Sequence, residues 1–147
     1  MKVLVTGGAG YIGARLVADL IGEGNEVRAL DRLLYGGEAL LPFFAHPRFR
    51  FVAGDIRDAA TVAQALEGVD AVVHLGAVVG EQACALDEAA AMTINRDAAL
   101  DLLRQAAERS VRRFVFLSTC SNYGISDPGT LADETTALNM PIFGLKS

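Results

Sequence analysis

Three glycines at intervals of three residues lie near the start of the chain, at Gly7, Gly10 and Gly13. They follow an apolar run of strand type and open a segment of helical period, whose first residues are Tyr11 and Ile12. Glycines at a strand-to-helix turn permit positive φ and let backbone approach a ligand, while the first helix amides attract phosphate. The pattern therefore predicts a turn that binds the pyrophosphate of a dinucleotide.

An acidic side chain, Asp31, ends the second apolar run of the chain. A carboxylate at this point accepts hydrogen bonds from the hydroxyls of an adenosine ribose and repels a 2′-phosphate, which favours NAD over NADP. Arg32 follows directly and supports the opposite choice, because an arginine there can hold a 2′-phosphate. We predict NAD as the cofactor, and these two residues leave NADP open.

Five short apolar runs alternate with segments of helical period, and these elements must position the glycine turn. Strands are expected at residues 2–6, 26–31, 49–53, 71–75 and 113–117. Helices are expected at residues 11–23, 58–66 and 87–108, with a short helix within 36–45. Because several of these strands contain near-continuous apolar runs, as at residues 3–5, 71–73 and 114–117, we predict an α/β fold, a Rossmann-type doubly wound parallel sheet truncated after five to six strands.

The composition fits one packed domain and excludes several classes of function. The 147 residues are 52% hydrophobic and 21% charged, and no apolar run reaches the roughly 18 residues of a membrane span. The net charge of −5 opposes nucleic-acid binding, and we predict no metal site. Two cysteines are too few for a disulfide framework, and the first residues are of strand type, so we expect a cytoplasmic protein without a signal peptide.

Further segments follow the glycine turn, and with it they resemble the NAD-dependent epimerase/dehydratase family, the extended short-chain dehydrogenases/reductases that act mostly on nucleotide sugars. The resemblance runs from residue 1 to about residue 124, in family order and at family spacing. The matching pieces are residues 6–13, Asp31, residues 54–58, residues 74–77, Asn95 and residues 118–124. The resemblance implies a dinucleotide as ligand and a nucleotide sugar as substrate.

The resemblance also implies roles around the cofactor. The residues that would contact its adenine, pyrophosphate and ribose follow the third and fourth expected strands: Asp55, Ile56, Leu75, Gly76 and Ala77. His74 would be only a strand-end residue. Asn95 would connect the long helix to the active-site strand or to cofactor-bound water, and an ordinary helix residue stays open as the alternative.

For catalysis, the resemblance points to a hydroxyl after the fifth strand and to a tyrosine–lysine pair further along. Thr119 occupies the hydroxyl position, with Ser121 as a nearby substitute, and would exchange a hydrogen bond with a substrate hydroxyl. Phe143 stands where the tyrosine is expected, and Lys146 follows three residues later, where the family has four. Since phenylalanine has no hydroxyl to ionise, we expect this chain alone to be inactive or weak.

Residues 1–147 are expected to form one NAD(P)-binding Rossmann domain, with the substrate domain of the family absent. A truncation, a frameshift product and a natural half-length protein all remain open. The sheet edge and helix faces left uncovered by the absent half would expose apolar surface, which predicts a homo-oligomer. The resemblance implies that the helix at 87–108 could form its interface, because dimers of the family pair such long helices. Cys120 and Ser121 replace the Asp-Glu pair of dehydratases, which favours an epimerase or dehydrogenase. The alternatives are a non-catalytic dinucleotide-binding or sensing module and a folded remnant without a role.

Overall fold

A computed structural model describes residues 1–119, 123 and 133–137 of the chain. The chain divides into two units, Met1–Phe116 and Leu117–Ser147, and every helix and strand named here lies in the first. In chain order these are β1 (Lys2–Thr6), α1 (Tyr11–Gly22), β2 (Glu26–Asp31), the 3₁₀ helix η1 (Glu38–Phe43), β3 (Phe49–Ala53), α2 (Ala59–Ala65), β4 (Ala71–His74), α3 (Glu81–Leu86), α4 (Glu88–Met92), the π-helical segment η2 (Thr93–Ala98), α5 (Ala99–Glu108) and β5 (Arg113–Phe116).

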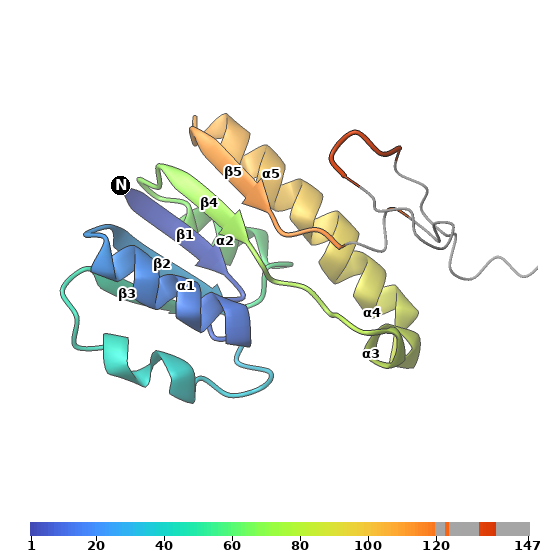
Figure 1. The fold of residues 1–147 in the computed structure, drawn as a ribbon, viewed down its shortest axis with the longest axis horizontal. Helices are drawn as coiled ribbons and strands as arrows, with labels where there is room; N and C mark the ends of the chain where they lie inside the picture. The colour runs from blue at the N-terminus through green and yellow to red at the C-terminus, as the bar shows by residue number, and fades with distance from the viewer. Residues whose placement is uncertain (120–122, 124–132, 138–147) are drawn as a thin grey trace, which may run out of the picture. The chain divides into compact units, whose positions relative to one another are not determined.

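The five strands form one parallel sheet in the order β3-β2-β1-β4-β5 (Figure 1). The chain moves outward from β1 to β3 and then crosses to the other side of β1 with β4. Such a reversal of strand order opens a crevice at the carboxyl ends of the two central strands, where ligands bind in sheets of this class. The predicted α/β fold of Rossmann type is therefore confirmed.

Each face of the sheet carries its own buried cluster, because successive residues of a strand point to opposite faces. Val3 and Val5 of β1 pack with residues of α1 and η1, whereas Leu4 packs with residues of α2 and α5. Fully burying one such aliphatic side chain contributes about 1.5–3 kcal/mol. Because both faces are covered, the central residues of the strands are mostly apolar, as is typical of parallel sheets.

The region between β4 and β5 differs from the sequence-based expectation of one α-helix over residues 87–108. The helix is instead built from α4, η2 and α5 in direct succession, with π-helical geometry in the middle segment. A further short helix, α3, precedes it and was not expected. Its six residues are too few to display a helical period. The residue before it is Gly80, which has φ of 95° and whose type is common in loops.

Candidate functional site

The glycine turn connects the end of β1 to the start of α1. Gly7 has φ of 70°, in the left-handed region, and a Cβ there would lie 2.8 Å from the backbone nitrogen of Gly76. A Cβ on Gly13 would collide with the carbonyl oxygen of Gly7 and with the backbone of Gly8. Glycine is therefore required at the first position by conformation and at the last by the close approach of turn and helix.

The first turn of α1 is open to a ligand. Gly10 precedes the helix and provides no side chain that caps it. The first amides of a helix have no intrahelical acceptor, and they carry a partial positive charge. The side chains of Tyr11 and Ile12, which begin the helix, are 97% and 55% exposed. The arrangement is one that binds a phosphate group through backbone N–H donors, without a basic side chain.

Asp31, at the end of β2, holds the glycine turn in place. Its Oδ2 accepts a hydrogen bond from the amide of Ala9 at 3.0 Å, and its Oδ1 accepts one from the amide of Leu33 at 2.8 Å. Each carboxylate oxygen keeps a second lone pair, so Asp31 can also accept hydrogen bonds from ribose hydroxyls. The connection to Ala9 was missed by sequence reasoning, because it joins residues 22 positions apart.

Asp55, which follows β3, lies between two arginines. Its carboxylate accepts hydrogen bonds from Arg57 Nη2 at 2.6 Å and Nε at 3.0 Å, and lies 3.2 Å from Arg32 Nη1. The side-chain hydrogen bonds from Arg57, helped by the charges of both guanidinium groups, lower the pKa of Asp55 to about 2, although burial acts in the opposite direction. Arg32 is thus paired with Asp55, and a 2′-phosphate would compete with this carboxylate for its guanidinium group.

The Asp55 cluster predicts a dependence of stability on acidic pH. Its pKa is about 2 in the folded chain, against an ordinary value of 3.8. Between these values the unfolded chain binds more protons, so the stabilisation is complete above the ordinary pKa and is lost as pH falls towards the folded one. Chemical denaturation of the wild type and of Asp55→Asn should show a stability difference that shrinks by about half between pH 6 and pH 3. A difference that stays constant over this range would contradict the assignment.

The end of β4 meets the glycine turn from the neighbouring strand. The amide of Leu75 donates to the carbonyl oxygen of Thr6 at 3.1 Å, and the amide of Gly76 donates to the Thr6 hydroxyl at 3.3 Å. The Cδ1 atom of Ile56 would lie 3.6 Å from a Cβ on Gly76. The exposed Ala77 follows directly. These predicted cofactor residues are therefore gathered beside the glycine turn, as the sequence order alone could not show.

A buried hydrogen bond between Thr6 and His74 joins β1 to β4 beside the turn. Thr6 Oγ1 lies 2.6 Å from His74 Nδ1, and the two residues are register partners with 0% and 2% exposure. Burial lowers the pKa of His74 to about 4, so the ring is neutral at pH 7. The rings of Phe114 and Phe116 in β5 lie 6.3 and 5.6 Å from it, centroid to centroid. His74 thus connects three strands at the site.

Replacing Thr6 with valine tests this connection. The substitution conserves shape, but it leaves the buried His74 Nδ1 without its partner and the Gly76 amide without its acceptor, which should destabilise the fold by about 1–3 kcal/mol. Thr93→Val is the matched control, because the exposed Thr93 hydroxyl donates only to the carbonyl oxygen of Ala90. Its cost should stay within about 0.5 kcal/mol in the same urea titration. Equal costs for the two variants would contradict the role given to Thr6.

Asn95, in η2, connects the long helix to the segment after β4. Its Oδ1 accepts a hydrogen bond from the amide of Val78, and its Nδ2 donates to the Val78 carbonyl oxygen, both at 2.8 Å. The side chain therefore holds the backbone that follows Ala77. A role for Asn95 towards a cofactor or its water stays a prediction.

The predicted catalytic residues come after Phe116 in the chain, the last residue of the first unit. Thr119 belongs to the second unit, Leu117–Ser147. Ser121, Phe143 and Lys146 lie outside the described residues. Their roles therefore stay predictions.

Two further findings concern the described residues only. They contain no group of three or more His, Cys, Asp or Glu side chains that could hold a metal ion. None of their helices combines the length and the apolar character needed to cross a bilayer. The candidate site is made of backbone amides, small and apolar residues and the carboxylates of Asp31 and Asp55, a donor set that fits the phosphates and riboses of a dinucleotide.

The sequence model of the NAD dependent epimerase/dehydratase family matches residues 3–143. The chain belongs to this family. Among curated members, the dTDP-glucose 4,6-dehydratase of Streptomyces griseus is 37% identical over 152 residues, covering 99% of this chain and 46% of the relative. The 3 beta-hydroxysteroid dehydrogenase/Delta 5-->4-isomerase of Mycobacterium tuberculosis is 38% identical over 124 residues, covering 82% of this chain and 32% of the relative.

Solved structures of the epimerase/dehydratase family have the same fold. The dTDP-glucose 4,6-dehydratase from Streptomyces venezuelae, solved with NAD bound, superposes with a TM-score of 0.86 at 38% identity, covering 95% of this chain and 46% of its own. The UDP-glucose 4-epimerase of Thermus thermophilus, in complex with NAD, gives a TM-score of 0.84 at 33% identity, covering 95% and 45%. The chain therefore spans under half the length of these relatives.

Proposed function

We propose that this chain is the NAD-binding portion of an epimerase/dehydratase-like oxidoreductase that acts on a nucleotide sugar. The observation that carries the proposal is the glycine turn, with the open amides of α1 on one side and the carboxylate of Asp31 on the other. Two relatives that share the fold have NAD bound. The match to the dehydratase covers 99% of this chain and the match to the steroid dehydrogenase covers 82%, which favours a nucleotide sugar.

In this proposal each group around the turn binds one part of the dinucleotide. The amides at the start of α1 bind the pyrophosphate, Asp31 accepts hydrogen bonds from the adenosine ribose, and Ile56 and Gly76 border the adenine and ribose. When bound, the nicotinamide accepts and returns a hydride. Thr119 would then orient the substrate hydroxyl through a hydrogen bond.

NAD is proposed over NADP on the surroundings of the ribose position. Asp31 places a negative charge where a 2′-phosphate would have to lie. Arg32, the residue that could offset this charge, lies 3.2 Å from Asp55 and is already paired. A 2′-phosphate would therefore meet one carboxylate and would compete with another for the arginine.

We further infer that this chain alone turns over little or no substrate. Phe143 stands at the position where the resemblance expects the ionisable tyrosine. The same residue favours a second candidate function, a non-catalytic module that binds or senses a dinucleotide. Both candidates bind the cofactor. They differ in whether the chain takes part in the chemistry of an oxidoreductase.

Calorimetric titration of the purified chain with NAD and then NADP tests the proposal. Saturable binding that is tighter for NAD is the expected result, and no binding of either cofactor by a folded chain would overturn it. Incubation with NAD and UDP-glucose or dTDP-glucose then separates the candidates. Turnover would exclude the non-catalytic module and the expected inactivity of the chain alone.

Self-association and a cytoplasmic location complete the proposal. The long helix exposes the apolar side chains of Met92, Leu100 and Leu103, and burial of such side chains drives association. Cys84 is a free thiol, which fits a reducing compartment. Sedimentation should give a mass above that of one chain, and a clean monomer would contradict the predicted oligomer.

A further inference from the structure

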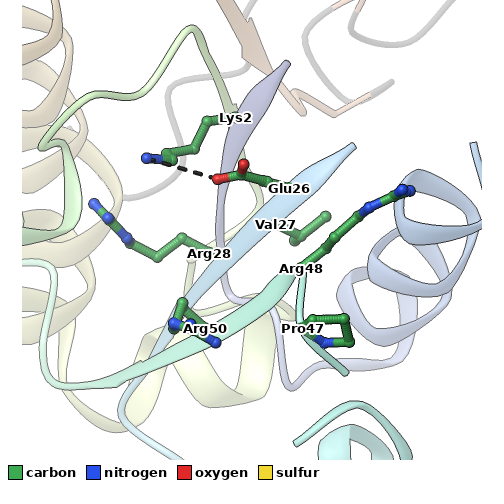
Figure 2. A pocket seen from close by; sticks show the side chains of 7 residues that line it. All are labelled: Lys2, Glu26, Val27, Arg28, Pro47, Arg48 and Arg50. Atoms are coloured by element: carbon green, nitrogen blue, oxygen red, sulfur yellow. Dashed lines mark ion pairs between the residues drawn. The ribbon is translucent and has the colours of Figure 1, made fainter. Parts of the chain in front are cut away.

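A second candidate site lies at the amino ends of the strands, opposite the glycine turn. A cavity of about 330 Å³ opens where β1 and β2 begin and where the chain enters β3 (Figure 2). The glycine turn follows the carboxyl end of β1, whereas the cavity lies at the amino ends of the strands. In a parallel sheet the two therefore lie at opposite ends of the strands. The charged residues that line the cavity are Lys2, Glu26, Arg28, Arg48 and Arg50. Four cationic residues and one carboxylate thus line a single cavity in a chain whose net charge is −5.

The three arginines of the cavity lack the carboxylate partners that most arginines of this chain have. Within the described part of the chain, Arg28, Arg48 and Arg50 form no ion pair. The one carboxylate of the lining, Glu26, lies 3.7 Å from Lys2 Nζ. Six of the other arginines pair with an aspartate at 2.6 to 3.2 Å, namely Arg15, Arg32, Arg57, Arg96, Arg104 and Arg112. Three positive charges therefore remain without a counter-charge at this cavity.

Two of these arginines face each other across neighbouring strands. Arg28 of β2 and Arg50 of β3 are register partners, and like charges in such a pair destabilise a sheet. Arg28 Nη1 donates to three carbonyl oxygens at the end of α2 and in the turn after it, at 2.6 to 3.1 Å, so its guanidinium is fixed. Arg50 Nη1 donates to the carbonyl oxygen of Phe49 at 2.9 Å. An anion bound between the strands would relieve the repulsion and use the remaining N–H groups of both side chains.

We propose that this cavity binds a small phosphorylated ligand that carries at least two phosphate charges. A guanidinium group presents a planar pair of donors that matches two phosphate oxygens, and several charges on one ligand match several arginines. The volume is at the lower end of the range for small-molecule pockets. Inorganic pyrophosphate and a nucleoside diphosphate share this chemistry. The site is separate from the proposed NAD site and does not depend on it.

A charged edge strand has another known use, since β3 ends the strand order and charges on an edge oppose pairing between sheets. The experiment must therefore separate ligand binding from edge protection. The double variant Arg48→Gln and Arg50→Gln removes two cavity charges and leaves Arg28 at the end of α2. The control, Arg104→Gln and Arg109→Gln, removes two charges from exposed positions on and after α5. Circular dichroism verifies the fold of both, and Arg48→Gln alone replaces the cavity variant if that variant does not fold.

Calorimetric titration with inorganic pyrophosphate measures the binding. The cavity variant should bind pyrophosphate at least about thirtyfold more weakly than the wild type, or about tenfold for Arg48→Gln alone, because hydrogen bonds to charged groups are lost. The control should stay within about threefold. ADP is titrated in parallel with NAD present at saturation, because ADP alone would also fit the proposed NAD site. Under this condition the cavity variant should again bind more weakly than the wild type, and ADP binding tighter than that of pyrophosphate assigns the cavity to a nucleoside diphosphate. The proposal would be overturned if the wild type did not bind, or if both variants lost affinity equally. It would also be overturned if the cavity variant kept its affinity and only aggregated more than the wild type, because the arginines would then serve to protect the sheet edge.

Discussion

Replacing Gly7 with alanine is expected to abolish saturable NAD binding and to destabilise the fold by about 2–5 kcal/mol. The φ of 70° at this residue is costly for any side chain. The new Cβ would also lie 2.8 Å from the nitrogen of Gly76 and 2.9 Å from the carbonyl carbon of Leu75. Both are backbone atoms of the segment that follows β4, so the turn and that segment must move apart. The proposed pyrophosphate position lies where they meet.

Gly22→Ala is the matched control for this substitution. Gly22 ends α1, has no positive φ, and a Cβ there would meet no atom within 4 Å. Alanine in a helix is expected to be neutral or stabilising by up to about 1 kcal/mol, with NAD binding unchanged. Urea denaturation and calorimetry of the two variants give both quantities. A Gly7→Ala variant that binds NAD like the wild type would show that the cofactor does not use this turn.

Asp31→Ala is expected to weaken NAD binding by about 10- to 150-fold, the value of one or more hydrogen bonds to a charged group. The loss has two sources, because the carboxylate is the proposed acceptor for the ribose and the observed acceptor for the Ala9 amide. NADP should lose less affinity than NAD, since the repulsion of a 2′-phosphate disappears with the carboxylate. Calorimetric titration with both cofactors measures the change in their ratio.

Asp19→Ala provides the control for the loss of one negative charge. Asp19 is exposed on α1 and pairs with Arg15 at 2.9 Å, away from the turn. Its removal should leave both affinities within about twofold of the wild type. If Asp31→Ala behaved like Asp19→Ala, the carboxylate would have no part in cofactor binding and the preference for NAD would need another origin.

The sheet could be predicted from the sequence because burial on both faces makes its strands rich in apolar residues. Val3, Leu4 and Val5 are all apolar since one face packs on α1 and the other on α2 and α5, and such runs are visible without a structure. The need for glycine at positions 7 and 13 was visible for a similar reason, because it depends on a local turn. The ends of β4 and β5 differ from the predicted ends by one residue, a difference without consequence for the fold.

The connections that hold the site together could not be predicted. The pairs Thr6–His74 and Asn95–Val78 join residues of different elements, and they exist only because of the register of β1 with β4 and the path of the chain after β4. A histidine at a strand end gives no sign that a threonine lies opposite. The same holds for Arg32, whose pairing with Asp55 depends on how the loops after β2 and β3 approach each other.

The double use of Asp31 has a consequence for how cofactor preference can evolve. One carboxylate fixes the amide of Ala9 and, in the proposed assignment, also occupies the place of a 2′-phosphate. A lineage that exchanges Asp31 for a small or basic residue therefore relaxes its glycine turn in the same mutational step. A change of preference to NADP along this branch requires a compensating substitution that restores an acceptor for Ala9. We therefore expect the two changes to occur together, because the single exchange leaves the Ala9 amide without its observed acceptor.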